Sequence, residues 1–196
     1  LRGGDLDLMA ELVRACESRS AYDEIENLYR DVIRTYDTMT VYDKLARHYL
    51  RMQRTREAER VYQEARKRFG DQREPHAWLA GFYSEQHRYD DAEQVLRGAV
   101  AAFPEDLDWY ERLASVGYGR GGDQGRCAIY TEAMDRFPHQ WRFVNGALAC
   151  IQPWEDKLVL LEREQLTVPE AHDQMMRSYG QNYLLVDRIA DAEAAL

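Results

Sequence analysis

Residues 39–72 read MTVYDKLARHYLRMQRTREAERVYQEARKRFGDQ, and residues 73–106 read REPHAWLAGFYSEQHRYDDAEQVLRGAVAAFPED. When the two lines are aligned, residues of the same kind fall at the same places, each pair 34 positions apart. The matching pairs are Leu45 and Leu79, Ala46 and Ala80, Tyr49 and Tyr83, Ala58 and Ala92, Tyr62 and Leu96, Ala65 and Ala99, and Gly70 and Pro104. This regular spacing of small, aromatic and helix-ending residues indicates an internal repeat.

Each line predicts two α-helices. The first helix of the first line carries apolar residues at i, i+3, i+4 and i+7, namely Tyr42, Leu45, Ala46 and Tyr49. Its second helix has a comparable face made of Ala58, Tyr62, Ala65 and Phe69. Because only the short polar stretch 52–55 joins the two helices, we expect them to run antiparallel. Gly70 and Pro104 end the second helices, glycine through a left-handed cap and proline because it cannot continue the hydrogen-bond ladder.

The unit resembles the tetratricopeptide repeat, a 34-residue helix–turn–helix. The family pattern has a large aromatic residue, leucine, a small residue and tyrosine on the first helix. Its second helix has alanine, an aromatic residue, alanine and a final proline. Residues 39–72 fit with Gly70 in place of proline, and residues 73–106 fit with His76 in place of the leading aromatic residue. The resemblance implies an all-α, right-handed α-solenoid of antiparallel helix pairs, whose first helices line a concave groove for peptides or partner helices.

Weaker copies of the pattern extend along the chain. The predicted repeats span residues 6–38, 39–72, 73–106 and 107–139, followed by a divergent repeat at 140–168 and a truncated one at 169–196. This division predicts a single solenoid domain over residues 1–196, with about eleven or twelve helices and no strand. Because the pattern stops midway through a helix, we also expect the chain to be a fragment of a longer protein.

The composition makes a nucleic-acid partner an unfavourable prediction. The formal net charge is −9 and the pI is near 5.1, whereas binding to a phosphate backbone depends on clustered lysine and arginine. Basic residues do crowd positions 47–68, but acidic residues are interleaved with them. A solvated helix face is therefore expected there.

The glycine-rich stretch GYGRGGDQGR at residues 117–126 has only a superficial likeness to a phosphate-binding loop. It lacks the Gly-Lys-Ser/Thr ending of such loops, and no strand is predicted before it. In the repeat register it falls between two helices, where glycine is expected to form the turn.

The sequence offers no motif for catalysis or metal binding. None of the five histidines stands at a ligand spacing with cysteine or acidic residues, and no nucleophile motif is present. Pairs of carboxylates such as Asp90 and Asp91 stand at helix starts, where negative charge favours the helix dipole. We therefore predict that the chain is not an enzyme and has no catalytic residue, no metal site and no cofactor.

The cysteines predict no disulfide framework. Cys16, Cys127 and Cys150 are odd in number and widely spaced, and they form no metal-binding cluster. No signal peptide opens the chain, and no run of roughly 18 apolar residues is present that could span a bilayer. The sequence thus predicts a cytoplasmic protein of a reducing compartment without a membrane partner.

The repeat register places the candidate partner-binding residues on the first helices. The residues expected at this face are Arg47, Trp78, Arg112 and Tyr118, with Asp43 and Ser84 beside them. Trp78 stands just outside the packing face of Leu79 and Tyr83, where it would provide an aromatic anchor. The alternative is that Trp78 fills the gap left by His76 at the leading aromatic position.

The same residues indicate what kind of ligand to expect. Two arginines beside a tryptophan suit a protein segment of mixed charge with an apolar residue, while Asp43, Asp108 and Glu111 disfavour a highly acidic one. The best-known peptide-binding subclass of the family grips a C-terminal carboxylate with lysine and asparagine at set groove positions. Asp43, Arg47, Trp78 and Asp108 stand at four of those positions and only Arg112 agrees with the pattern, so the sequence does not support that mode of binding.

We predict a non-catalytic scaffold that binds a protein or peptide partner in the concave groove. Two alternatives remain open at this point. One is a regulatory arm of a larger enzyme whose catalytic domain lies outside this chain, and the other is an RNA-processing scaffold of the half-a-tetratricopeptide kind. The oligomeric state is not predicted.

Overall fold

The computed structural model describes residues 3–36, 38–152, 156–157 and 159–160. Within these residues the chain forms eight helices and no strand. Their bounds are α1 (Gly3–Ser18), α2 (Tyr22–Tyr36), α3 (Met39–Arg51), α4 (Thr55–Arg68), α5 (Arg73–Glu85), α6 (Tyr89–Ala102), α7 (Asp108–Arg136) and α8 (Trp141–Leu148). The truncated repeat predicted at 169–196, and the further helices expected there, lie outside the described residues.

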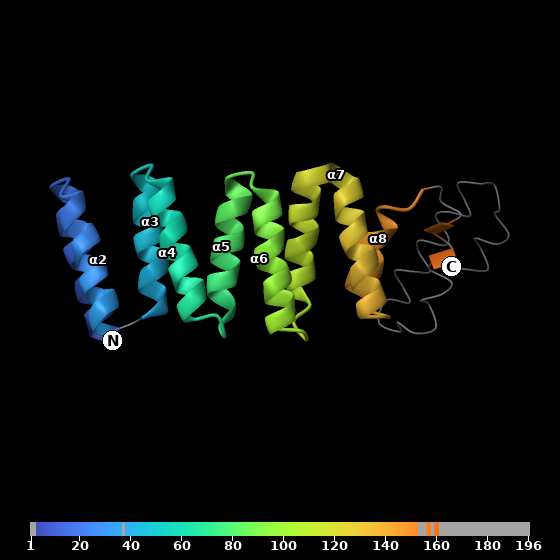
Figure 1. Cartoon of the computed structure of the whole chain (residues 1–196), viewed down its shortest axis with the longest axis horizontal. Helices are drawn as coiled ribbons and strands as arrows, with labels where there is room; N and C mark the ends of the chain where they lie inside the picture. Colours follow the sequence, from blue (N-terminus) through green and yellow to red (C-terminus); the bar gives the residue numbers. More distant parts are fainter. Residues whose placement is uncertain (1–2, 37, 153–155, 158, 161–196) are drawn as a thin grey trace, which may run out of the picture. The chain divides into compact units, whose positions relative to one another are not determined.

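The chain divides into two compact units, Leu1–Glu105 and Asp106–Leu196. In the first unit each helix packs against the next along the chain, from α1 to α6. Figure 1 shows α2 to α6 following one another in chain order. In the second unit α8 packs against α7. That all six predicted repeats form one solenoid domain remains a prediction.

The helix ends of the central repeats follow the predicted 34-residue phase. Helices α4, α6 and α7 end at Arg68, Ala102 and Arg136, each two residues before Gly70, Pro104 or Pro138. The turn between the two helices of each of the first three repeats contains one residue with a left-handed backbone, and these residues recur with nearly the same spacing. These residues are Ser20, Gln53 and His87, with φ angles of 56°, 58° and 57°.

One aromatic contact recurs in three successive repeats, where the start of a first helix meets the end of its second helix. The rings are Tyr42 with Phe69, His76 with Phe103, and Tyr110 with Phe137, each pair edge-to-face with centroids 5.7 Å apart. His76 is only 5% exposed, and its Nε2–H donates a hydrogen bond to the Gly70 carbonyl oxygen, 2.9 Å away. Histidine therefore occupies the leading aromatic position itself and leaves no gap there for Trp78 to fill.

Small residues let the helices of each pair cross closely, as the sequence indicates. The alanines at the crossing positions of the second and third repeats are buried, namely Ala46, Ala58, Ala65, Ala80, Ala92 and Ala99. A larger side chain at these places would overfill a close-packed interior.

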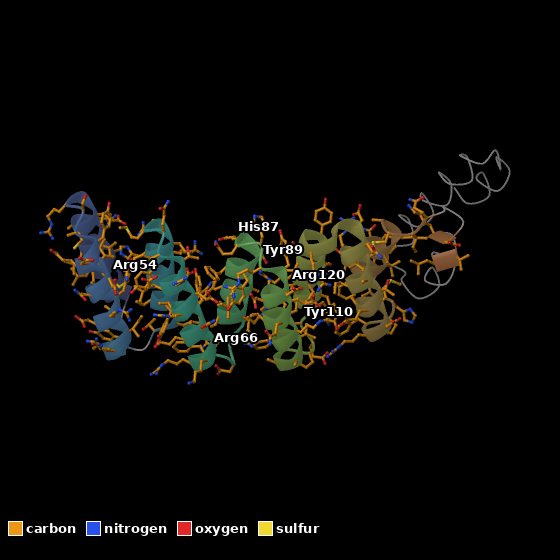
Figure 2. The ribbon with its side chains drawn as sticks, turned by 45° about the horizontal axis from the view of Figure 1, so that its top comes forward. Arg54, Arg66, His87, Tyr89, Tyr110 and Arg120 are labelled. Carbon is orange, nitrogen blue, oxygen red and sulfur yellow. A yellow bond between two sulfur atoms is a disulfide. The ribbon has the colours of Figure 1, made fainter. Side chains whose placement is uncertain are left out.

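In the second and third repeats, an arginine donates a hydrogen bond to a glutamate of the repeat before it. The guanidinium of Arg54, at the start of α4 (Figure 2), lies 4.7 Å from the ring centroid of Tyr49 and donates to Glu26 of α2 at 2.8 Å. In the next repeat Arg88 lies 4.4 Å from the Tyr83 ring and donates to Glu59 of α4 at 2.9 Å. We call this arrangement the arginine–tyrosine bridge. It combines a cation–π contact with a charge-assisted hydrogen bond.

The fourth repeat replaces this bridge with glycine. Gly117 stands where Tyr49 and Tyr83 stand in the earlier repeats, and it is buried within α7. The predicted turn over residues 117–126 is confined to Gly121 and Gly122, which have non-helical backbone angles, whereas the flanking glycines are helical. Gly117 and Gly125 approach so closely that a Cβ atom on Gly117 would lie 2.7 Å from the Gly125 carbonyl oxygen. Glycine here provides a close helix crossing as well as a turn.

The structure corrects the prediction for the cysteines. Cys127 of α7 and Cys150, just after α8, form a disulfide with their Cα atoms 5.5 Å apart, and Cys16 is free and buried. The wide sequence spacing was misleading because α8 folds back against the second half of α7. A disulfide is typical of an oxidising environment, so the cysteines do not support a reducing compartment.

His48 is expected to make the first unit sensitive to acid. It is 2% exposed, and burial together with the nearby Arg51 lowers its pKa. The unfolded chain therefore binds a proton on this residue more readily than the folded chain, and the free energy of unfolding falls as the pH drops below about 6.5. Urea titrations should show that the free energy of unfolding decreases less between pH 7.5 and pH 5.5 in His48→Gln than in wild type. The control variant His87→Gln, at an exposed position, should show the same decrease as wild type. An equal decrease in all three proteins would contradict this role of His48.

Candidate partner-binding grooves

The structure brings Arg47, Trp78 and Asp43 together in one groove between α3 and α5. This α3/α5 groove has a volume of about 230 Å³. Its lining residues are Asp43, Arg47, Leu50, Tyr62, Ala77, Trp78, Gly81, Phe82 and Glu85. Three of the residues predicted from the repeat register therefore share one surface.

Small residues on α5 keep the α3/α5 groove open beside Trp78. Ala77 and Gly81 both line it, and a Cβ atom added to Gly81 would meet no atom within 4 Å. Trp78 itself is half-buried. Its ring is thus partly held by the protein and partly available to a ligand, which is the setting in which tryptophan contributes most to an interface.

The carboxylate of Asp43 is already engaged by two neighbours. The Arg47 Nε atom donates to both of its oxygens, at 3.0 and 2.9 Å, and the Tyr62 hydroxyl donates to Oδ1 at 3.2 Å. Burial, and then the charge of Asp43, raise the pKa of Tyr62, so its hydroxyl stays protonated as the donor. The prediction that Asp43 disfavours acidic ligands is weakened by these contacts, because Arg47 balances its charge.

Ser84 contributes less than the register indicates. Its hydroxyl donates to the Ala80 carbonyl oxygen one turn earlier, at 2.9 Å. The proton of this side chain is therefore used within α5, and only its oxygen can accept a bond from a ligand.

A second groove, between α1 and α3, was not predicted. This α1/α3 groove has a volume of about 570 Å³. Its lining residues are Met9, Ala10, Val13, Arg14, Glu17, Tyr29, Lys44, Arg47, Leu50 and Arg51. Lys44, Arg47 and Arg51 stand at i, i+3 and i+7 on α3, a spacing that places them on one helix face. This basic stripe was readable from the sequence, whereas the pattern of apolar residues on α1 does not indicate that they border a groove.

The remaining predicted residues lie in the second unit. Arg112 is exposed, with its guanidinium 5.8 Å from the ring centroid of Trp109. Tyr118 is 54% exposed, and the guanidinium of Arg126 lies 5.4 Å from its ring centroid. That these two residues share one wall with Arg47 and Trp78 remains a prediction.

The acidic residues predicted for the second unit are also engaged. Arg142 of α8 donates to Asp108 at 3.1 Å and to Glu111 at 3.2 Å. One guanidinium thus faces both carboxylates, and their effect on an acidic ligand is reduced.

In the described part of the chain, no group of three or more histidine, cysteine, aspartate or glutamate residues is arranged to hold a metal ion. None of the helices described combines the length and apolarity that crossing a membrane requires.

A family model described as tetratricopeptide repeat matches residues 44–115. Residues 44–115 carry tetratricopeptide repeats. The matched stretch covers α4, α5 and α6, with most of α3 and the start of α7, and includes the whole α5 side of the α3/α5 groove. No curated protein matches the chain in sequence.

Solved structures confirm the predicted fold class for these tetratricopeptide repeats. One is "MamA 41-end from Desulfovibrio magneticus RS-1", 16% identical, with a TM-score of 0.50, covering 91% of this chain and 98% of that chain. Another is PilF of Pseudomonas aeruginosa, 14% identical, with a TM-score of 0.51, covering 96% of this chain and 87% of that chain. At such low identity the likeness shows the solenoid fold of helix pairs and nothing about their ligands.

Proposed function

We propose that this chain is a non-catalytic scaffold for protein–protein interaction, and that a partner segment binds to the face formed by the first helices α3 and α5. The repeat family supports an interaction role. The single observation that carries the proposal is the half-buried Trp78, which lines one groove together with Gly81 and the ion pair of Arg47 and Asp43. A tryptophan anchor beside a guanidinium group is the composition in which binding energy concentrates at protein interfaces.

The expected ligand follows from this composition. An apolar side chain of the partner would pack against Trp78 above Ala77 and Gly81. Polar or charged neighbours of that side chain would meet Arg47 and Glu85 at the rim. Truncating a tryptophan in such a place typically costs ~2 kcal/mol or more of binding free energy.

Trp78→Ala is expected to weaken partner binding at least tenfold. The partner would be captured from a lysate on the purified chain, identified by mass spectrometry, purified and titrated by calorimetry against wild type and variant. Circular dichroism checks that the variant is folded. The matched control is Arg60→Ala on α4, whose side chain is exposed and lies outside both grooves. If Trp78→Ala binds as wild type does while Arg60→Ala does not, the working surface is on the second helices and the proposal is wrong.

The same capture experiment separates the alternatives. A captured enzyme whose activity changes on binding would favour a regulatory arm of a larger enzyme. Captured RNA, removable by ribonuclease, would favour an RNA-processing scaffold, against which the net charge of −9 argues.

The cytoplasmic location predicted from the sequence can be tested through the cysteines. Cells would be lysed in denaturant with a maleimide reagent that traps free thiols. If the protein is in a reducing compartment, the reagent should label Cys16, Cys127 and Cys150. Labelling of Cys16 alone would show that Cys127 and Cys150 are joined in the cell, as they are in the structure. That result would place the protein in an oxidising compartment.

A further inference from the structure

The α1/α3 groove has an apolar floor that is already shaped before any ligand binds. Met9 and Val13 of α1 are 4% and 8% exposed, and Leu50 of α3 is half-buried beside them. The groove volume of about 570 Å³, against about 230 Å³ for the α3/α5 groove, falls in the range of sites that bury most of a small ligand. It has room for a bulky apolar side chain and its neighbours.

Positive charge surrounds this floor. Arg14 of α1 and Lys44, Arg47 and Arg51 of α3 all line the groove, and Glu17 is its one acidic lining residue. Arg51 is bound to Glu17 at 3.0 Å, and Arg47 is bound to Asp43 outside this groove at 2.9 Å.

Two of these cations are available to a ligand. Arg14 and Lys44 are exposed and form no ion pair with any residue that the structure describes. They stand on opposite sides of the groove, one on each helix. Four cations against one carboxylate give this lining a local excess of positive charge on a chain whose net charge is −9.

We propose that the α1/α3 groove binds an internal acidic segment of a partner protein, which inserts a bulky apolar side chain between Met9, Val13 and Leu50 and places flanking carboxylates near Arg14 and Lys44. The proposal rests on the proposed function and names the partner chemistry of a neighbouring groove. Arg47 and Leu50 line both grooves, so one extended segment can follow the face from α1 to α5.

Charge and shape together select this occupant. A nucleic acid could offer phosphates to the cations but would leave the apolar floor without a partner. A purely apolar segment would leave Arg14 and Lys44 without a counter-charge near a partly desolvated surface. A segment that alternates acidic and bulky apolar residues satisfies both parts of the groove.

The test begins with selection from a phage-displayed library of random 12-residue peptides on the immobilised full chain. We expect enriched sequences to carry net negative charge and at least one bulky apolar residue. The leading peptide would be synthesised with a fluorescein label and titrated by fluorescence anisotropy. Its affinity should fall as salt is raised, because the cations are exposed.

Charge reversal then locates the site. Arg14→Glu combined with Lys44→Glu should weaken the labelled peptide at least tenfold. The matched control, Arg60→Glu combined with Lys67→Glu, makes the same charge change at exposed positions of α4 outside both grooves and should weaken it less than twofold. Ala10→Trp, which fills the groove without changing its charge, should also abolish binding, with circular dichroism confirming the fold.

Several results would overturn the proposal. These are enrichment of neutral or basic peptides, no enrichment at all, equal effects of the two charge reversals, and dimerisation or anionic-vesicle binding through Arg14 and Lys44 in place of peptide binding. If the peptide tests fail but Trp78→Ala still weakens the captured partner, only this inference is wrong. If the reversal at Arg14 and Lys44 weakens the captured partner while Trp78→Ala does not, the groove assigned under the proposed function is wrong and this one stands.

Discussion

Replacing Gly117 with alanine is expected to lower the free energy of unfolding of the second unit by about 2 kcal/mol. Helix propensity alone predicts the opposite sign, because alanine in a helix interior is more favourable than glycine by roughly 1 kcal/mol. At Gly117 the added Cβ atom would lie 2.7 Å from the carbonyl oxygen and 3.0 Å from the carbonyl carbon of Gly125. Both are backbone atoms, so the helix segments must move apart.

Gly81→Ala is the matched control for this prediction. Gly81 also lies inside a helix, but a Cβ atom there would meet nothing within 4 Å. It should raise the free energy of unfolding by about 0.5–1 kcal/mol through propensity. Urea titrations followed by circular dichroism measure both variants. A rise in the free energy of unfolding for Gly117→Ala as well would mean that the close approach of Gly117 and Gly125 does not limit the packing.

Reducing the Cys127–Cys150 disulfide should cost the second unit about 3 kcal/mol. The two cysteines are 23 positions apart, and opening a loop of this length restores conformational entropy to the unfolded chain. The unfolding free energy would be compared with and without dithiothreitol in wild type and in Cys127→Ser combined with Cys150→Ser. We expect the reductant to act only on wild type.

Cys16→Ala provides the control for the disulfide. Its thiol is free and buried in the first unit, so the variant should respond to dithiothreitol as fully as wild type does. A reductant effect that disappears with Cys16, or that persists without Cys127 and Cys150, would show that the pairing is different.

The repeat phase made much of the fold predictable from sequence. Helix pairing depends on contacts between residues less than about 34 positions apart in the sequence. The spacing of residues such as Ala46, Ala58 and Tyr49 predicts these contacts. Even the departure at His76 was placed correctly, although its role needed the structure. Edge-to-face packing on Phe103 shows that an imidazole can take the place of a larger ring.

The disulfide and the second groove were not predictable in the same way. Whether Cys127 meets Cys150 depends on how α8 turns back on α7 in a part of the chain where the repeat pattern has faded. The α1/α3 groove depends on where two first helices leave space between them, and a pattern of buried residues does not specify unfilled volume. The repeat register predicted that Arg47 and Trp78 lie on the same face, and both line the α3/α5 groove. It did not indicate that Asp43 accepts hydrogen bonds from Arg47 and Tyr62.

The arginine–tyrosine bridge has a consequence for how such a chain can grow or shrink. Arg54 binds Glu26 of the preceding repeat, and Arg88 binds Glu59 in the same manner, so each junction uses a guanidinium from one repeat and a carboxylate from the one before. The second repeat supplies a donor and an acceptor: Arg54 donates to the preceding repeat, and Glu59 accepts from the following repeat. A duplicated copy of it would therefore meet its neighbours with the required donor and acceptor already in place. In the fourth repeat Gly117 and Gly122 stand at the sequence positions of the tyrosine and the arginine, so a copy of that repeat would not carry this donor.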